Sequence, residues 1–121
     1  MQLLESGEMY LETIFILSKT HNYVRSVDIA NYTGYSKPSV SRAVNLLKDN
    51  GYISIDDDGH ISLEKSGADV ASRIYERHTL LTNMLCKIGV NRETASADAC
   101  KMEHVISDET FEKLKEFLDK L

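Results

Sequence analysis

The spacing of apolar residues along the chain changes once, near residue 53, from a helical period to the alternation typical of β-strands. Ahead of this point, segments 7–18 and 37–49 carry apolar residues three or four positions apart. Beyond it, apolar and polar residues alternate over 53–56 and 60–63, on either side of Asp57-Asp58-Gly59. Alternation around a short glycine-containing turn predicts a two-stranded hairpin.

Local signals divide the residues ahead of the hairpin into three helices, predicted over 7–18, 27–32 and 37–49. Ser26 and Ser36 each stand where the N-cap of a helix is expected, because a serine hydroxyl can accept a hydrogen bond from a first-turn amide. A helix, a short helix, a third helix and a hairpin in this order predict a winged helix-turn-helix.

The pattern after the hairpin is helical again, so we expect a mainly α chain. A long helix is predicted over 66–88, and two further helices are predicted to begin after Asn91 and Ser107. The sequence thus predicts two domains with no flexible linker between them, a winged helix-turn-helix over 1–64 and an all-helical domain over 65–121.

Composition limits where such a chain acts and how it assembles. The chain has 121 residues, of which 42% are hydrophobic, and two small halves would each be short of core, so a homodimer is expected. Neither a membrane span nor a signal peptide is recognisable, which favours a cytoplasmic protein without a membrane partner. Two cysteines, Cys86 and Cys100, do not make a disulfide framework and suit a reducing compartment.

Short polar and basic side chains gather at the start of segment 37–49, as in a helix that reads the DNA major groove. The predicted DNA-contacting residues are Ser36, Lys37, Pro38, Ser39, Ser41 and Arg42. A solvated surface helix would look similar, but the position between a short helix and a hairpin favours DNA. The net charge of −5 and the acidic hairpin tip count against this interpretation, so a weak or absent wing contact is expected. His21 and His60 are expected at the surface.

A second set of residues is typical of a metal site. Cys100, Glu103 and His104 are three and four positions apart, which stacks them on one face of a helix. Thiolate, carboxylate and imidazole together suit a divalent transition metal. Met9 and Glu12 are also three positions apart, on a face of the predicted first helix outside its apolar stripe. We expect Cys86, on the long helix, to be a core residue. Another histidine, His78, lies on the long helix.

These segments resemble the diphtheria-toxin-repressor-like, iron- and manganese-dependent repressors over essentially the whole chain. Residues 8–14 (EMYLETI) resemble the first helix of that family, and 36–41 (SKPSVS) the start of its recognition helix. Arg77-His78 resembles the basic–histidine pair of its long helix. The most specific match is 98–109 (DACKMEHVISDE).

The resemblance implies an effector-metal site made by Met9, Cys100, Glu103 and His104, as in the iron-responsive branch. The second site of that branch uses a histidine matching His78 together with a glutamate and a histidine. Those two positions hold Thr82 and Ser96 here. The manganese branch instead has carboxylates on its first helix, of which this chain keeps Glu12, so a second site from His78 and Glu12 is the alternative. We expect no SH3-like third domain.

The function implied is a metal-dependent repressor that binds operator DNA as a dimer. Metal is expected to join the first helix to the dimerisation half and so fix the separation of the two recognition helices. The sulfur ligands Met9 and Cys100 favour Fe(II), with Mn(II) a partial substitute and Co(II) or Ni(II) active in vitro.

The same residues are compatible with several rival functions. One is a manganese-responsive member of the same family, and another is a regulator whose Cys100 senses oxidation. A winged helix that binds only protein is a third. A metalloenzyme is disfavoured, because the sequence has no glycine-rich phosphate loop and no convincing nucleophile–base pair, so neither catalysis nor a small-molecule substrate is expected.

Overall fold

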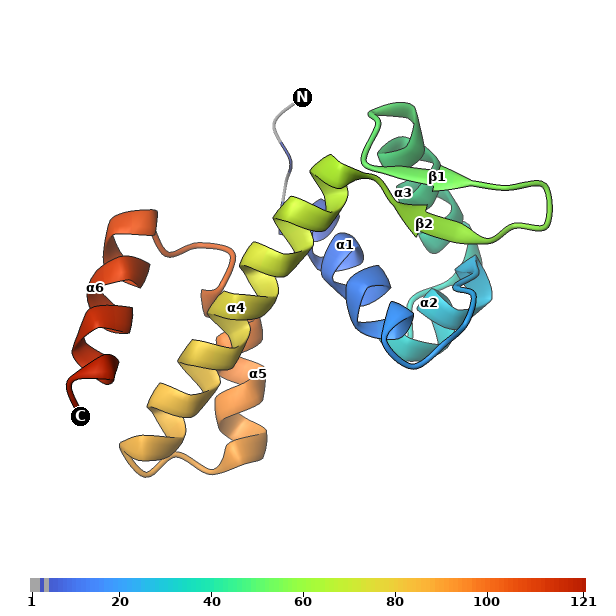
Figure 1. The fold of residues 1–121 in the computed structure, drawn as a ribbon. Helices are drawn as coiled ribbons and strands as arrows, with labels where there is room; N and C mark the ends of the chain where they lie inside the picture. The colour runs from blue at the N-terminus through green and yellow to red at the C-terminus, as the bar shows by residue number, and fades with distance from the viewer. Residues whose placement is uncertain (1–2, 4) are drawn as a thin grey trace. The chain divides into compact units, whose positions relative to one another are not determined.

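A computed structural model of the protein describes residue 3 and residues 5–121, and it is mainly helical, as the sequence predicts (Figure 1). In chain order the elements are α1 (Glu5–Ser18), α2 (Ser26–Thr33), α3 (Lys37–Asp49), β1 (Ile53–Ile55), β2 (Ile61–Leu63), α4 (Lys65–Lys87), α5 (Arg92–Met102) and α6 (Asp108–Asp119). Within this described part, no helix combines the length and apolar composition that crossing a membrane requires.

The chain folds as two compact units, residues 1–72 and 73–121, called here the N-terminal and C-terminal units. The helix α4 begins in the first and ends in the second, so the units share one helix and no separate linker segment lies between them.

The core of the N-terminal unit lies between its three helices and the hairpin. Leu11 and Ile14 of α1 are completely buried, and they pack in one cluster with Ile29 of α2 and with Val40 and Val44 of α3. The residues of α1 and α3 in this cluster lie in the segments whose apolar spacing predicts a buried face. The helix α1 begins at Glu5, two residues ahead of its predicted start.

Helix ends follow the predicted signals at α3 but not at α2. The hydroxyl of Ser36 accepts the amide hydrogen of Ser39 at 3.2 Å, which confirms Ser36 as the N-cap of α3. At α2 the prediction is wrong, since Ser26 is already helical and Arg25 is the cap residue. There the side chain of Asp28 reaches back to accept the amide hydrogen of Arg25 at 2.9 Å, so the cap acceptor comes from inside the helix.

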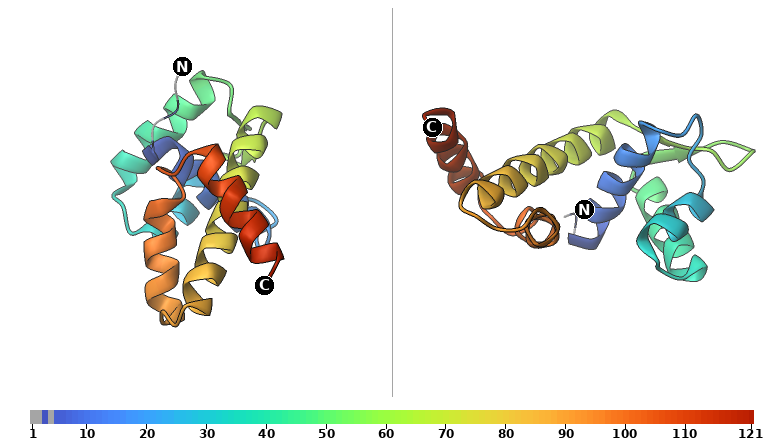
Figure 2. Two further views of the ribbon diagram at one scale, coloured as in Figure 1. Left: turned by 90° about the vertical axis from the view of Figure 1, so that its left-hand side faces the viewer. Right: turned by 90° about the horizontal axis from the view of Figure 1, so that it is seen from below.

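The hairpin pairs β1 with β2 in antiparallel register, with Ile53 opposite Leu63. Its turn projects away from the three helices of this unit (Figures 1 and 2). Next to the turn, the amide of Ile61 donates to the carbonyl of Val24 at 2.7 Å. At the open end of the hairpin, Gly67 of α4 packs so tightly on the backbone carbonyl of Tyr52 that a Cβ there would overlap it.

The C-terminal unit is helical throughout, and α5 runs beside the second half of α4 (Figure 2). Ile74 and Leu81 of α4 are buried, as are Ala95 and Ala99 of α5. Gly89, with a φ of 105°, lies in the turn between the two helices. A side chain would be strained in this left-handed conformation, so glycine suits the sharp change of direction.

Serine and asparagine caps set the starts of the last two helices, as predicted. The side chain of Asn91 accepts the amide hydrogen of Glu93 at 2.9 Å, and that of Ser107 accepts the amide hydrogen of Thr110 at 3.1 Å. Leu121 lies beyond the end of α6 and is 70% exposed.

Candidate metal centre and nucleic-acid interface

The buried guanidinium of Arg77, on α4, holds the connection between α5 and α6. Its Nη1 donates to the carbonyl oxygens of Glu103 at 3.2 Å and Ile106 at 2.7 Å, and its Nη2 donates to the carboxylate of Asp108. The guanidinium carbon also lies 5.4 Å from the centre of the Phe111 ring. Carbonyls at and beyond the end of a helix need donors from elsewhere, and here Arg77 supplies them.

Glu103 begins that connection, and its side chain is completely buried. Its Oε2 lies 2.8 Å from Nδ1 of His78 on α4, and its Oε1 lies 3.4 Å from Nε2 of His104. The side chain of His104 is itself only 2% exposed. Two imidazoles therefore flank one buried carboxylate within the C-terminal unit.

This arrangement fits a divalent metal ion. Although Oε1 of Glu103 is buried, it has no hydrogen-bond partner among the described residues. A buried carboxylate oxygen without a partner costs free energy, and a cation would satisfy it. Carboxylate and imidazole are ligands that first-row divalent metals accept. Glu103 and His104 are thus the residues of this unit best placed to hold a metal.

Helix α5 ends earlier than the predicted metal cluster requires. Its last residue is Met102, Glu103 is its C-cap residue, and His104 lies in the turn that follows. The prediction that one helix carries all three cluster residues is therefore wrong for His104. The amide of Glu103 still donates to Ala99 at 2.9 Å, and after it the chain leaves the helical path towards α6. Cys100, one turn ahead of Glu103, is exposed.

The two candidate ligands of α1 lie one turn apart in the N-terminal unit. Met9 is half-buried, and its sulfur lies 3.6 Å from the hydroxyl of Thr13. Glu12 is only 6% exposed, which is unusual for a carboxylate. Both residues are thus largely shielded from solvent, although they lie on a different face of α1 from its apolar stripe.

The predicted DNA-contacting residues gather on the exposed face of α3. Ser36, Lys37, Pro38, Ser41 and Arg42 are exposed, and only Ser39 is half-buried. The side chain of Ser39 lies 3.4 Å from a guanidinium nitrogen of Arg42, which donates to its hydroxyl. The exposed start of α3 thus carries hydroxyls and two cations, a composition suited to contacts with phosphates and bases.

His60, expected to be merely exposed, instead takes part in a cluster beside the turn of the hairpin. Its ring stacks on Tyr23 with centroids 4.1 Å apart, and a guanidinium nitrogen of Arg25 lies 3.0 Å from its Nε2. Because a guanidinium only donates, Nε2 must accept, and the ring hydrogen sits on Nδ1, 3.2 Å from a carboxylate oxygen of Asp56. Sequence reasoning missed this cluster, because its members are up to 37 residues apart.

The hairpin tip itself remains acidic in the structure. Asp56, Asp57 and Asp58 are all exposed. The backbone amides of His60 and Asp58 donate to Asp56, and the first of these bonds is the main reason why the pKa of Asp56 lies below its ordinary value. The tip thus stays negatively charged near neutral pH, which is consistent with a weak wing contact to DNA.

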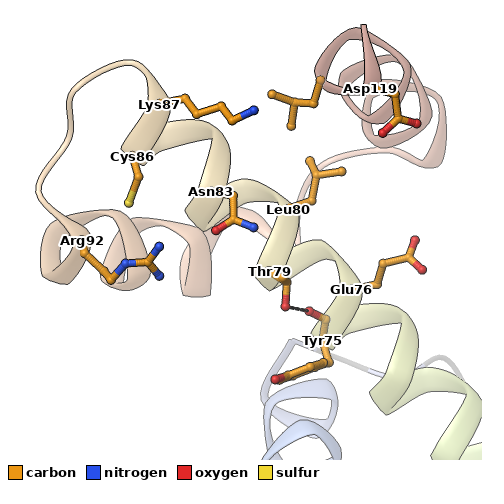
Figure 3. Close-up of a pocket in the computed structure, with 10 residues that line it drawn as sticks. Tyr75, Glu76, Thr79, Leu80, Asn83, Cys86, Lys87, Arg92 and Asp119 are labelled. Atoms are coloured by element: carbon orange, nitrogen blue, oxygen red, sulfur yellow. Dashed lines mark hydrogen bonds between the residues drawn. The ribbon is translucent and has the colours of Figure 1, made fainter. Parts of the chain in front are cut away.

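A groove of about 760 Å³ opens between α4, the start of α5 and the end of α6 (Figure 3). Leu80 and Leu118 line it, with Cys86, Lys87 and Arg92 nearer one end. Cys86 is therefore a half-buried groove residue and not the core residue expected from its apolar neighbours.

Two protein-family models match almost the whole chain. The family described as iron dependent repressor, N-terminal DNA binding domain, matches residues 2–61, and the iron dependent repressor, metal binding and dimerisation domain, matches residues 64–121. The chain belongs to the iron-dependent repressor family. This confirms the resemblance read from the sequence.

Relatives within the family differ in length. An uncharacterised HTH-type transcriptional regulator from Methanocaldococcus jannaschii is 31% identical over 118 residues, which are 96% of this chain and 94% of that protein. The iron-dependent repressor IdeR from Mycobacterium bovis is 30% identical over 119 residues, 98% of this chain but 52% of IdeR. The chain thus spans about half the length of IdeR.

Solved structures support the same family. The structure of the manganese regulator SloR superposes with a TM-score of 0.84 at 28% identity, covering 98% of this chain and 55% of SloR. The winged helix and the helical half are therefore a known architecture of the iron-dependent repressor family. The names of IdeR and SloR point to different metals, so family membership leaves open which metal this chain binds.

The role of Arg77 yields a stability prediction. Arg77→Ala removes the donors of two backbone carbonyls and of Asp108, and it should lower the free energy of unfolding by about 2–4 kcal/mol. The control is Lys113→Ala, which breaks an exposed ion pair with Glu116 and should change stability little. Urea denaturation followed by circular dichroism measures both, and equal stabilities of the two variants would contradict the assigned role.

Proposed function

We propose that this protein is a metal-dependent transcriptional repressor that binds operator DNA as a dimer when loaded with Fe(II). The buried carboxylate of Glu103 carries the proposal, because one of its oxygens has no hydrogen-bond partner among the described residues and faces His104. It lies in the domain matched to metal binding and dimerisation. The exposed face of α3 supplies the DNA-reading side of the function.

The full ligand set that we propose adds residues from the sequence pattern. Met9, Glu12 and Cys100 join Glu103 and His104 as candidate ligands. A thioether and a thiolate favour the softer Fe(II), whereas a site of carboxylates and imidazoles alone would suit Mn(II). Since Glu12 is a hard ligand, Mn(II) is the second candidate activator.

Binding of metal and of DNA are coupled in this proposal. A bound divalent ion supplies positive charge at the buried carboxylate of Glu103. Protein conformations that bring the ligands together then become more populated, and those that also present α3 to DNA gain operator affinity. By linkage, operator DNA tightens metal binding by the same factor. The repressor is a regulator and needs no catalytic step.

The central prediction is metal-dependent DNA binding. Anaerobic titration with Fe(II) or Mn(II) should raise the affinity for promoter DNA of the protein's own operon, and a chelator should reverse the effect. Glu103→Gln and His104→Ala should abolish the metal response, while the exposed Glu93→Gln on α5 should keep it. Fluorescence anisotropy with labelled DNA measures all of these.

Two outcomes of this titration would change the conclusion. A response to Mn(II) at far lower free concentration than to Fe(II) would place the protein among manganese regulators, and Met9→Asp with Cys100→Glu should then alter little. The exposure of Cys100 favours a second function, thiol-based redox sensing. In that case an oxidant should release DNA from the metal-saturated protein, and Cys100→Ser should prevent this release.

The recognition face gives a prediction of its own. Arg42→Ala should weaken binding to the operator by about 1–3 kcal/mol if Arg42 reads a base. Lys37→Ala should weaken binding to all sequences and reduce the slope of log affinity against log salt by about one. Wild-type operator affinity in both variants would show that α3 is not the reading helix.

A second copy of the chain is the partner that we propose for the groove between α4 and α6. Apolar side chains line or border it, and Phe117 is 61% exposed on the same helix as Leu118. Leu118→Asp should therefore turn the dimer into a monomer in sedimentation at micromolar concentration. Thr94→Asp adds the same charge at an exposed site of α5 and should leave the dimer intact. A wild-type protein that is always monomeric contradicts the proposal.

A further inference from the structure

The ring of His78 uses both of its nitrogens within the C-terminal unit. Its Nδ1 lies 2.8 Å from Oε2 of Glu103, and its Nε2 lies 3.4 Å from the hydroxyl of Ser96 on α5. A carboxylate oxygen only accepts hydrogen bonds, so Nδ1 carries the hydrogen and donates it to Glu103. Both polar edges of the ring thus face protein groups.

Besides Glu103, the C-terminal unit places two hydroxyls near His78. Thr82 follows it by one helical turn on α4, and Ser96 faces its ring. Neutral hydroxyls are poor ligands for first-row divalent ions compared with carboxylates and imidazoles. The hydroxyl of Thr82 is also buried without a hydrogen-bond partner among the described residues. Apart from Glu103, these residues of the C-terminal unit add no charged ligand for a second ion bound at His78.

We propose that His78 is a positioning residue for Glu103 and not a metal ligand, so that each chain binds a single divalent ion. The inference rests on the proposed function, since it assumes that Glu103 binds metal. By holding Oε2, His78 fixes the carboxylate and leaves Oε1, which faces His104 at 3.4 Å, as the ligand atom. Loss of such an orienting hydrogen bond typically lowers metal affinity about 10- to 100-fold.

Three variants of the full chain separate positioning from ligation. His78→Ala removes the hydrogen bond to Glu103. His78→Asn puts an amide N–H close to the position of Nδ1, so it can still donate, but it is a poor metal ligand. Thr82→Glu combined with Ser96→His adds a carboxylate and an imidazole beside His78, and this double variant should create the second site that the natural chain lacks.

The experiment measures Mn(II) and Co(II) bound per chain by equilibrium dialysis and metal analysis, without DNA. Wild type should bind one ion. His78→Ala should bind one ion about 10- to 100-fold more weakly, and His78→Asn should stay within a few-fold of wild type. The double variant at positions 82 and 96 should bind two ions. Circular dichroism of the metal-free proteins checks their folding, and if His78→Ala does not fold, His78→Asn and the wild-type stoichiometry decide.

Each contrary outcome has a distinct meaning. Two ions on the wild type, reduced to one by both His78 variants, would make His78 a ligand of a second metal and overturn the inference. A His78→Asn variant as weak as His78→Ala would make it a ligand of the single ion and overturn it too. A folded wild-type protein that binds no ion at all would instead defeat the proposed function, on which the inference depends.

Discussion

The helical half depends on one buried cation, the guanidinium of Arg77. The residues between α5 and α6 form no regular structure, so the carbonyls of Glu103 and Ile106 have to find donors outside a helix. Arg77 provides both from α4, and Asp108 balances its charge. A buried guanidinium is tolerated only with such partners, and the same bonds place Glu103 beside the histidine one residue further along α4. The candidate metal centre and the packing of the unit are therefore parts of one polar network.

Much of the architecture could be predicted from the sequence because it depends on local chemistry. The burial of Leu11, Ile14 and Val44 follows from the helical spacing of apolar residues, and Ser36 and Ser107 cap helices through hydroxyls only three residues from the amides they bind. The cap of α2 could not be read in this way. Its acceptor is the carboxylate of Asp28, inside the helix. From the sequence, either Arg25 or Ser26 could have been the cap residue.

The candidate site was predictable in its residue types but not in its contacts. Spacing brings out Glu103 and His104 as neighbours, and the family resemblance adds His78. The hydrogen bond between His78 and Glu103 joins residues 25 positions apart, and it exists only because α5 packs beside α4. The cluster of His60 with Arg25 and Tyr23 likewise joins residues far apart in the sequence, so no periodic pattern could reveal it. Polar contacts between residues distant in the sequence therefore could not be predicted from local sequence patterns.

The close approach of Gly67 to Tyr52 bears on how this protein can be divided in the laboratory. The first two turns of α4 belong to the N-terminal unit, where Ala71 is completely buried in the core. A fragment cut directly after the hairpin would remove this cover and expose the apolar side chains beneath it. A stable isolated DNA-binding fragment, or a chimera between two family members, therefore needs its junction after Ser72, inside a continuous helix. Exchanging modules here means splicing a helix in register.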